Sequence, residues 1–263
     1  MTTITISNTK GGTGKTTTAL NLATELSNLD KKVLLIDGNF SAPNLGLHLD
    51  IINPEVTLHH VLSRKANIGD AIYKLEKFDV VPSSIFHRIR INPLMLKDKI
   101  SHLKRKYDVI LVDSSPALNE ETLAVMLASD ELFIVTTPDY PTLSTTLKAL
   151  KLAKQRGTKI NGLILNKVYN KDFELSLEDI EKAAEIPVMA VIPHDINVLK
   201  ALSEFTPSTN YKPKSEASIE YKKLAAILIG EKYKPLRLRK LFGWINPRKQ
   251  EINRTIFYKQ IFE

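Results

Sequence analysis

Residues suited to binding phosphate lie at the start of the chain. A β-rich run through Ser7 leads directly into Asn8-Thr9-Lys10-Gly11-Gly12-Thr13-Gly14-Lys15-Thr16-Thr17-Thr18, and an amphipathic segment follows. Glycines let the backbone wrap around an anion, so that consecutive N–H groups and the N-terminus of the helix face it. The sequence therefore predicts a phosphate-binding loop made by Gly11, Gly12, Thr13, Gly14, Lys15, Thr16 and Thr17.

Two side chains of this loop have distinct chemical roles. We expect Lys15 to reach the β- and γ-phosphates of a nucleotide, since a lysine at this place in such a loop is a point charge for phosphate. Thr16 supplies a hydroxyl for Mg²⁺, which takes few protein oxygens and keeps several waters. The expected ligands are therefore ATP and Mg²⁺.

The rest of the chain alternates short apolar runs with segments of helical period. We expect strands at Thr3–Ser7, Lys32–Asp37, Phe78–Pro82, Asp108–Asp113, Glu131–Thr136, Lys159–Leu165 and Val188–Ile192. We expect helices at Lys15–Leu29, Pro93–Lys106, Glu120–Ala128, Leu143–Arg156, Leu177–Ala184 and Ile219–Ile229, with a surface loop at Thr206–Ser215. Continuously apolar strands indicate a sheet covered on both faces. The predicted fold is α/β, a doubly wound and mostly parallel sheet flanked by helices in three layers.

The loop departs from the common P-loop pattern, because Thr9 replaces its first glycine and Lys10 follows. Lys-Gly-Gly-Thr-Gly-Lys-Thr resembles the deviant Walker A motif of the MinD/ParA family of P-loop ATPases. In that family the extra lysine reaches across a dimer to the partner's nucleotide. The resemblance implies this role for Lys10, and it implies that ATP completes a homodimer which hydrolysis releases.

Further segments resemble the family in the same order over residues 2–230. Val33–Gly46 resembles a motif in which a strand ends in Asp-x-Asp and an Asn-Leu pair follows, and Tyr107–Ala117 is similar to the Walker B strand. The resemblance implies that Asp37 lies beside the phosphates and the metal ion, and that Asp113 holds Mg²⁺ through water.

Two later segments resemble the family's base-binding elements. Ile164–Val168 resembles a strand whose terminal asparagine, here Asn166, reads adenine, because an amide both donates to and accepts from a base edge. Ile192–Asp195, with Pro193, resembles the loop that closes over the base.

Asn39 stands where MinD-like relatives carry the second carboxylate, which is thought to orient or deprotonate the attacking water. An amide can hold water but cannot accept its proton. Because positioning and electrostatics carry most of phosphoryl transfer, we expect slow hydrolysis rather than none. The alternative is that Asn39 is neutral because Asp37 suffices.

Positive charge is concentrated at the C-terminal end. The chain has a net charge of +8, and residues 231–263 hold nine Lys/Arg against three Glu, which supplies +6 of it. We expect a domain over residues 1–230 and a basic amphipathic tail over residues 231–263. Within Leu236–Ile245, apolar residues recur at helical spacing and basic residues take the other face, which favours an anionic membrane surface. Packing of this segment on the body and binding to nucleic acid are the alternatives.

The sequence leaves several functions open. We expect a MinD-like ATPase that cycles on a membrane to position division, motility or other machinery, with an unidentified activator or cargo protein. A ParA-like partition ATPase binding DNA nonspecifically is the alternative, as is an ATP-sensing scaffold that hardly hydrolyses. The chain has no cysteine, which excludes the iron–sulfur relatives of this fold. Its first residues lack a signal peptide pattern, so we expect a cytoplasmic protein, peripheral at the inner face of the cell membrane.

Overall fold

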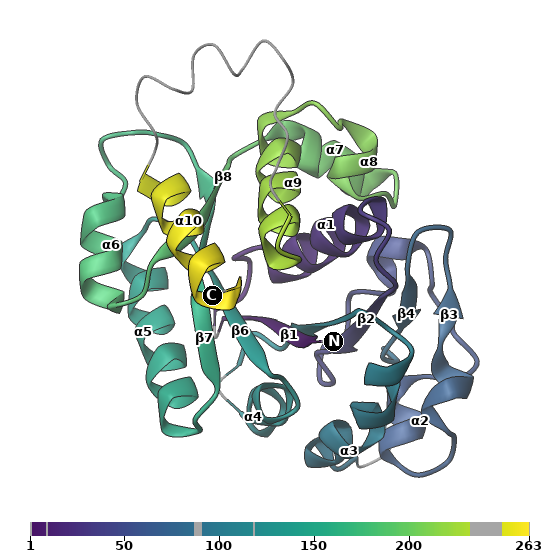
Figure 1. Ribbon diagram of the computed structural model, residues 1–263. Coiled ribbons are helices and arrows are strands. Elements are labelled where there is room, and N and C mark those ends of the chain that lie inside the picture. The colour runs from purple at the N-terminus through teal and green to yellow at the C-terminus, as the bar shows by residue number, and fades with distance from the viewer. Residues whose placement is uncertain (1, 9, 87–90, 118, 232–248, 263) are drawn as a thin grey trace.

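An eight-stranded sheet forms the middle layer of the fold in the computed structural model, which describes residues 2–8, 10–86, 91–117, 119–231 and 249–262 (Figure 1). The strands are β1 (Thr2–Ser7), β2 (Val33–Gly38), β3 (Tyr73–Lys74), β4 (Asp79–Val81), β5 (Val109–Ser114), β6 (Glu131–Thr136), β7 (Lys159–Val168) and β8 (Val188–Pro193). Their order is β3-β4-β2-β5-β1-β6-β7-β8, and every neighbouring pair is parallel except β3 with β4. The expected α/β fold with a mostly parallel sheet is confirmed.

Helices cover both faces of this sheet. They are α1 (Lys15–Asn28), α2 (Leu58–Leu62), α3 (Leu96–Ser101), α4 (Glu120–Leu127), α5 (Tyr140–Gln155), α6 (Leu177–Ala184), α7 (Ile196–Ser203), α8 (Ser208–Tyr211), α9 (Glu216–Leu228) and α10 (Lys249–Phe262). Short 3-10 helices lie at Leu47–Leu49, Ile68–Ala71, Pro93–Met95 and His102–Arg105. Within the described residues, no helix combines the length and the apolar composition needed to cross a membrane.

The strands are apolar throughout because each of their faces meets a helix layer. In β2, Leu35 packs into the cluster under α1 and α9, whereas Leu34 and Ile36 pack into the cluster under α2 and α3. A third cluster joins α5 and α6 to the β6–β8 side. Side chains of successive strand residues point to opposite faces, so a strand buried on both sides needs a continuous apolar run.

Two of the predicted segments differ from the structure. The helix expected at Pro93–Lys106 is an α-helix of Leu96–Ser101 between two 3-10 segments. The loop expected at Thr206–Ser215 contains α8, and Ser208 and Thr209 are buried in it. Oδ1 of Asn21 accepts hydrogen bonds from Ser208 Oγ and Thr209 N, both at 2.9 Å, which fixes α8 on α1.

The C-terminal helix α10 packs back on the body, beside β8 and α9 (Figure 1). Phe257 is 4% exposed and its ring meets that of Phe133 edge to face, with centroids 6.1 Å apart. Arg254 Nη2 lies 2.5 Å from Oε2 of Glu220 on α9. The predicted membrane segment Leu236–Ile245 lies outside the described residues.

Candidate nucleotide site

The candidate site lies at the carboxyl edge of the parallel strands. In the register of the sheet, Asp37 on β2 pairs with Asp113 on β5, and Asp113 pairs with Ile6 of β1 on its other side. The strand order reverses at β1, because β2 and β5 lie to one side and β6, β7 and β8 lie to the other. Crevices at such reversal points are the usual ligand sites of doubly wound sheets.

The glycine-rich loop connects β1 to α1, and Gly14 immediately precedes the helix. Gly14 has φ +94°, and a Cβ there would lie 2.1 Å from Nδ2 of Asn166, so the position requires glycine. Gly11 and Gly12 are exposed, whereas Thr13 is buried. The first turn of α1 has no side-chain cap, so its N–H groups stay available to an anion.

Lys15 is the first residue of α1 and is 7% exposed. Its Nζ donates to the carbonyl oxygen of Lys10 at 3.1 Å. Burial lowers the pKa of Lys15, and the charge of Asp113 opposes this shift. A phosphate entering the loop would supply the countercharge that this buried ammonium lacks. Thr17 lies half-buried on the same turn, and its carbonyl accepts a hydrogen bond from Asn21 Nδ2 at 2.8 Å.

Thr16 and Asp113 meet as a metal site would require. Thr16 Oγ1 lies 2.6 Å from Oδ2 of Asp113 and 3.2 Å from Oδ1 of Asn44. Oδ1 of Asp113 is buried without a hydrogen-bond partner among the described residues. No cluster of three or more His, Cys, Asp or Glu side chains in the described chain forms an all-protein cage. A hydroxyl, a free carboxylate oxygen and room for water fit Mg²⁺, which seldom uses such cages.

Asp37 organises the loop that follows β2. Its carboxylate accepts hydrogen bonds from the backbone N–H groups of Asn39 and Leu45, each at 3.1 Å. Burial, followed by the nearby charge of Asp113, raises the pKa of Asp37 to about 8. Burial also raises the pKa of Asp113 to about 6, against the effects of Thr16 and Lys15. A cation between the two carboxylates would favour their ionised forms.

Asn39 is turned toward its own loop. Its side chain is bonded to both the N–H and the C=O of Ala42, and the residue is 5% exposed. An aspartate in this orientation could accept from the N–H of Ala42 but could not donate to its carbonyl. In this arrangement Asn39 closes a turn, because both the Nδ2 and the Oδ1 of its amide are already hydrogen-bonded to Ala42.

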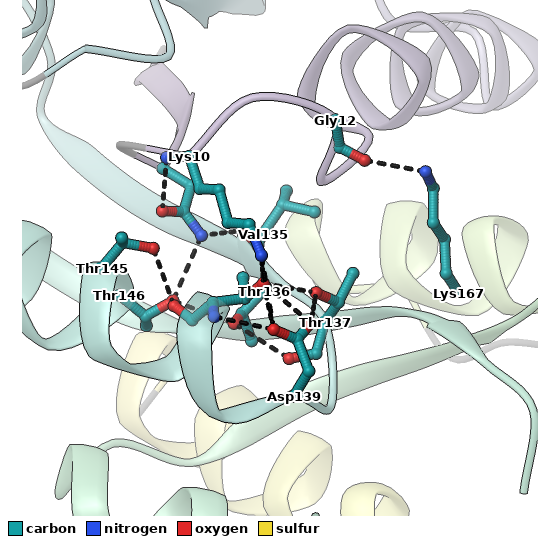
Figure 2. A network of polar contacts seen from close by, with 11 residues as sticks. Lys10, Gly12, Val135, Thr136, Thr137, Asp139, Thr145, Thr146 and Lys167 are labelled. Carbon is teal, nitrogen blue, oxygen red and sulfur yellow. Dashed lines mark hydrogen bonds and ion pairs between the residues drawn. The ribbon is translucent and has the colours of Figure 1, made fainter. Parts of the chain in front are cut away.

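Lys10 lies on the outer rim of the loop, where Figure 2 shows it reaching toward α5. Nζ of Lys10 is 2.7 Å from Oγ1 of Thr142 and 3.3 Å from Oδ1 of Asp139. Asp139 is also the N-cap of α5, accepting from the backbone N–H of Thr142. Partial burial opposes ionisation of Asp139, but hydrogen bonds from Thr137, Thr142 and Lys10 hold its pKa below the usual value. The side chain of Lys10 stays 39% exposed.

The two residues predicted to bind the base, Asn166 and Pro193, lie near the ends of β7 and β8. Asn166, at 6% exposure, donates from Nδ2 to the carbonyl of Thr13 at 2.8 Å, and its Oδ1 accepts from the N–H of Lys167. Pro193 ends β8, and the ring of His194 after it stacks on Tyr169 with centroids 4.4 Å apart. Asn166 therefore contacts the phosphate loop itself.

The structure adds residues that sequence reasoning missed. Asn8 is fully buried, and its side-chain amide donates to Val135 O at 2.6 Å and to Thr146 Oγ1 at 3.1 Å. Asp139 and Thr142 contact Lys10, and Asn44, the asparagine of the Asn-Leu pair noted in the sequence, contacts Thr16. The available signal was position, since Asn8 directly follows β1, and Asp139 follows β6 after Thr137 and Pro138, at the edge where these strands end.

Comparisons with known proteins agree with this geometry. A family model described as an AAA domain matches residues 1–162. An uncharacterised ATP-binding protein of Methanocaldococcus jannaschii is 35% identical over 248 residues, covering 92% of this chain and 93% of the relative.

Two solved structures are similar over most of their length. The cell division ATPase MinD of Pyrococcus furiosus superposes with a TM-score of 0.81 at 36% identity, covering 85% of this chain and 96% of that one. The septum site-determining protein MinD of Pyrococcus horikoshii, in complex with Mg-ADP, gives a TM-score of 0.82 at 34% identity, covering 86% and 95%. The phosphate loop, the sheet that carries it and this similarity along the chain agree: the protein belongs to the MinD/ParA family of P-loop ATPases.

Proposed function

We propose that this protein binds ATP with Mg²⁺, forms an ATP-dependent homodimer and cycles on an anionic membrane surface to position division, motility or other machinery. The placement of Lys10 is the observation that carries the proposal. Its side chain is 39% exposed and lies on the rim of the loop, whereas the side chain of Lys15 is directed into the loop, where it donates to the carbonyl of Lys10. A lysine in this position is accessible to the nucleotide of a second copy.

The surface around Lys10 supports a partner there. A pocket of about 290 Å³ beside the loop is lined by Lys10, Lys167, Tyr169, Phe173 and Glu174 among others. Tyr140 and Phe173 are each 77% exposed. Exposed aromatic side chains of this kind are enriched in the buried parts of protein interfaces. We assign this surface to the second copy, and we expect an activator or cargo protein to recognise the assembled dimer.

The residues expected to hold Mg²⁺ and the phosphates support ATP hydrolysis at a low rate. Thr16 and Asp113 supply oxygens for Mg²⁺, and Lys15 would neutralise charge on the β- and γ-phosphates. Asn39 offers no carboxylate for the attacking water, and its amide is engaged by Ala42. The same observation favours a second candidate, an ATP-sensing scaffold that hardly hydrolyses. Single-turnover hydrolysis separates the two, because a scaffold would release almost no phosphate within the lifetime of its dimer.

The membrane contact is proposed for Leu236–Ile245. This segment joins α9 to α10, and both of these helices are packed on the body. A basic residue close to an anionic bilayer contributes about 1 kcal/mol. Replacing Arg237, Arg239 and Lys240 by Gln should therefore weaken membrane binding roughly a hundredfold.

Co-sedimentation with anionic liposomes, and separately with DNA, tests the proposal. The intact protein should pellet with liposomes in Mg-ATP and remain in solution in Mg-ADP, and the triple Gln variant should remain in solution in both. A matched control replaces three exposed lysines of the body, Lys65, Lys97 and Lys182, by Gln. Co-sedimentation with DNA and not with lipid would replace this proposal by a ParA-like partition function.

A further inference from the structure

Three backbone carbonyls of the phosphate loop are each held by a side-chain donor. The carbonyl of Lys10 accepts from Lys15 Nζ at 3.1 Å, and that of Thr13 accepts from Asn166 Nδ2 at 2.8 Å. The carbonyl of Gly12 accepts from Lys167 Nζ, also at 2.8 Å. Figure 2 shows the contact between Gly12 and Lys167 from close by. The last two donors are neighbours in sequence, at the end of β7.

The backbone at the end of β7 is irregular in a way that lets both neighbours reach the loop. Side chains of successive strand residues normally point to opposite faces of a sheet. Lys167 has φ +56°, a conformation that a lysine seldom adopts, and the pairing of β7 with β8 shifts register between Leu165 and Val168. Oδ1 of Asn166 accepts from the N–H of Lys167 at 2.9 Å and fixes this turn. Unfavourable backbone conformations of this kind concentrate at functional sites.

A side chain that fixes the carbonyl of one residue also fixes the direction of the next residue's N–H, because the two groups belong to one peptide plane. In a planar trans peptide the C=O of one residue and the N–H of the next point in opposite directions. With the carbonyls of Gly12 and Thr13 drawn toward β7, the N–H groups of Thr13 and Gly14 are turned away from β7. Phosphate loops bind their anion through backbone N–H groups that point inward while the carbonyls point outward.

We propose that Lys167 is a positioning residue for the nucleotide phosphates. Together with Asn166 it holds the Gly12–Thr13 and Thr13–Gly14 peptides in the orientation that phosphate needs, before the nucleotide arrives. Its ammonium also adds positive charge at the mouth of the loop. The inference rests on the proposed nucleotide binding and is independent of dimerisation and of membrane contact.

Lys167 suits a clean test because it is exposed and its bond is made to an uncharged carbonyl. Because water can replace an exposed contact of this kind, the substituted protein should fold. Inorganic pyrophosphate is the sharper probe, since it contacts the loop but carries no base for Asn166. Mg-ADP is the second probe, and both affinities are measured by calorimetry on the full chain.

Four proteins are compared: the wild type, Lys167→Met, Lys167→Arg and the control Lys171→Met, which removes an exposed lysine four residues further on. We expect Lys167→Met to weaken pyrophosphate and Mg-ADP by the same factor, roughly tenfold. Lys167→Arg, which keeps a donor and a charge, should recover most of this loss, and Lys171→Met should bind as the wild type does. Thermal unfolding without nucleotide should be the same for all four proteins.

Three results would overturn the inference: wild-type affinity in Lys167→Met, an equal loss in Lys171→Met, or a loss confined to Mg-ADP. The last would place Lys167 at the base rather than at the phosphates. Failure of the proposed cycling function leaves a different signature, in which the wild type binds Mg-ADP but neither dimerises nor pellets with liposomes in Mg-ATP.

Discussion

Two ion pairs, one at the phosphate loop and one under the C-terminal helix, show how burial separates a replaceable contact from a structural one. Lys10 and Asp139 lie 3.3 Å apart with side chains 39% and 44% exposed. Arg254 and Glu220 lie 2.5 Å apart with side chains 5% and 6% exposed. Water can replace either partner of the first pair, so breaking it costs little. Breaking the second leaves a charge in the interior.

The surroundings of each pair fit this difference. Arg254 also donates from Nε to the carbonyl of Met189 at 2.7 Å, and Glu220 also meets Lys223 at 2.8 Å. Burial opposes ionisation of Glu220, but the charges of Arg254 and Lys223 hold its pKa below the usual value. Lys10 can leave Asp139, because Thr137 and Thr142 still satisfy that carboxylate. Lys10 can therefore exchange Asp139 for another partner, whereas the pair of Arg254 and Glu220 is a permanent part of the folded structure.

The largest effect is expected from Arg254→Ala, which leaves Glu220 buried beside Lys223 alone. We expect a loss of about 3–4 kcal/mol in the free energy of unfolding at pH 7. A lowered carboxyl pKa contributes stability above the unfolded pKa, and this contribution is lost as the pH falls. The loss in the variant should therefore shrink toward pH 4. Urea unfolding measures it, with Arg254→Ala/Glu220→Gln as the matched variant; a loss below 1 kcal/mol would mean that α10 is not held by this pair.

Asp113→Asn is expected to stabilise the protein when Mg²⁺ and nucleotide are removed. The pKa of Asp113 is raised to about 6, so above that pH the native state holds an ionised carboxylate at a cost. Replacing it by an amide should add about 3 kcal/mol at pH 8, and the gain should fade below pH 6 and vanish near pH 4. Chemical unfolding in EDTA at pH 8 and pH 4 measures this. A stability difference that does not depend on pH would contradict the assigned pKa.

Asn39→Asp should speed ATP turnover, because it returns a carboxylate to the place where relatives position water. We expect an increase of roughly tenfold, less than the roughly hundredfold or more of a fully positioned base, because positioning and electrostatics carry most of phosphoryl transfer. The aspartate must give up the bond to the carbonyl of Ala42, which frees it to turn toward the nucleotide. Steady-state phosphate release measures the effect. An unchanged or lower rate would show that the turn closed by Asn39 matters more than a base does.

Asp139→Asn should have the smallest effect on folding, since asparagine also caps helices and the lost pair is half-exposed. We expect the free energy of unfolding to change by less than about 0.5 kcal/mol. Lys10 loses its charged resting partner, so the ATP-bound dimer should tighten by a few fold. Sedimentation velocity across a concentration series gives the dimer dissociation constant. A weaker dimer would indicate that Asp139 orients Lys10 for its task instead of competing for it.

Local patterns explain why much of the site could be predicted from sequence. The P-loop is specified by a strand, glycines and a helix in immediate succession, and Asp37 and Asp113 each lie next to the last residue of an apolar strand of a parallel sheet. The partners of Lys10, Asp139 and Thr142, lie more than 125 residues away in the chain, and no pattern in the sequence around Lys10 predicts them. The side chain of Asn39 turns inward because it is hydrogen-bonded to the backbone of Ala42, and a sequence motif does not predict this contact.

The elements that could not be predicted are short or weakly patterned. α8 has four residues and is fixed by Asn21 rather than by its own periodicity. α10 carries apolar residues that the sequence displays, but its docking depends on buried polar contacts such as that of Arg254 with Glu220. Such contacts come from the tertiary fold, and hydrophobic period alone does not encode them.

The mass of the protein in solution tests the central claim most directly, that Lys10 acts across an ATP-dependent dimer. Light scattering would compare the wild type and Lys10→Ala in Mg-ATP and Mg-ADP, with Lys151→Ala, at an exposed position on α5, as control. We predict dimers in Mg-ATP and monomers in Mg-ADP for the wild type and the control. Lys10→Ala should stay monomeric in both while it still binds ATP. The claim would be contradicted if Lys10→Ala formed a dimer in Mg-ATP, or if the wild type had the same mass in Mg-ATP as in Mg-ADP.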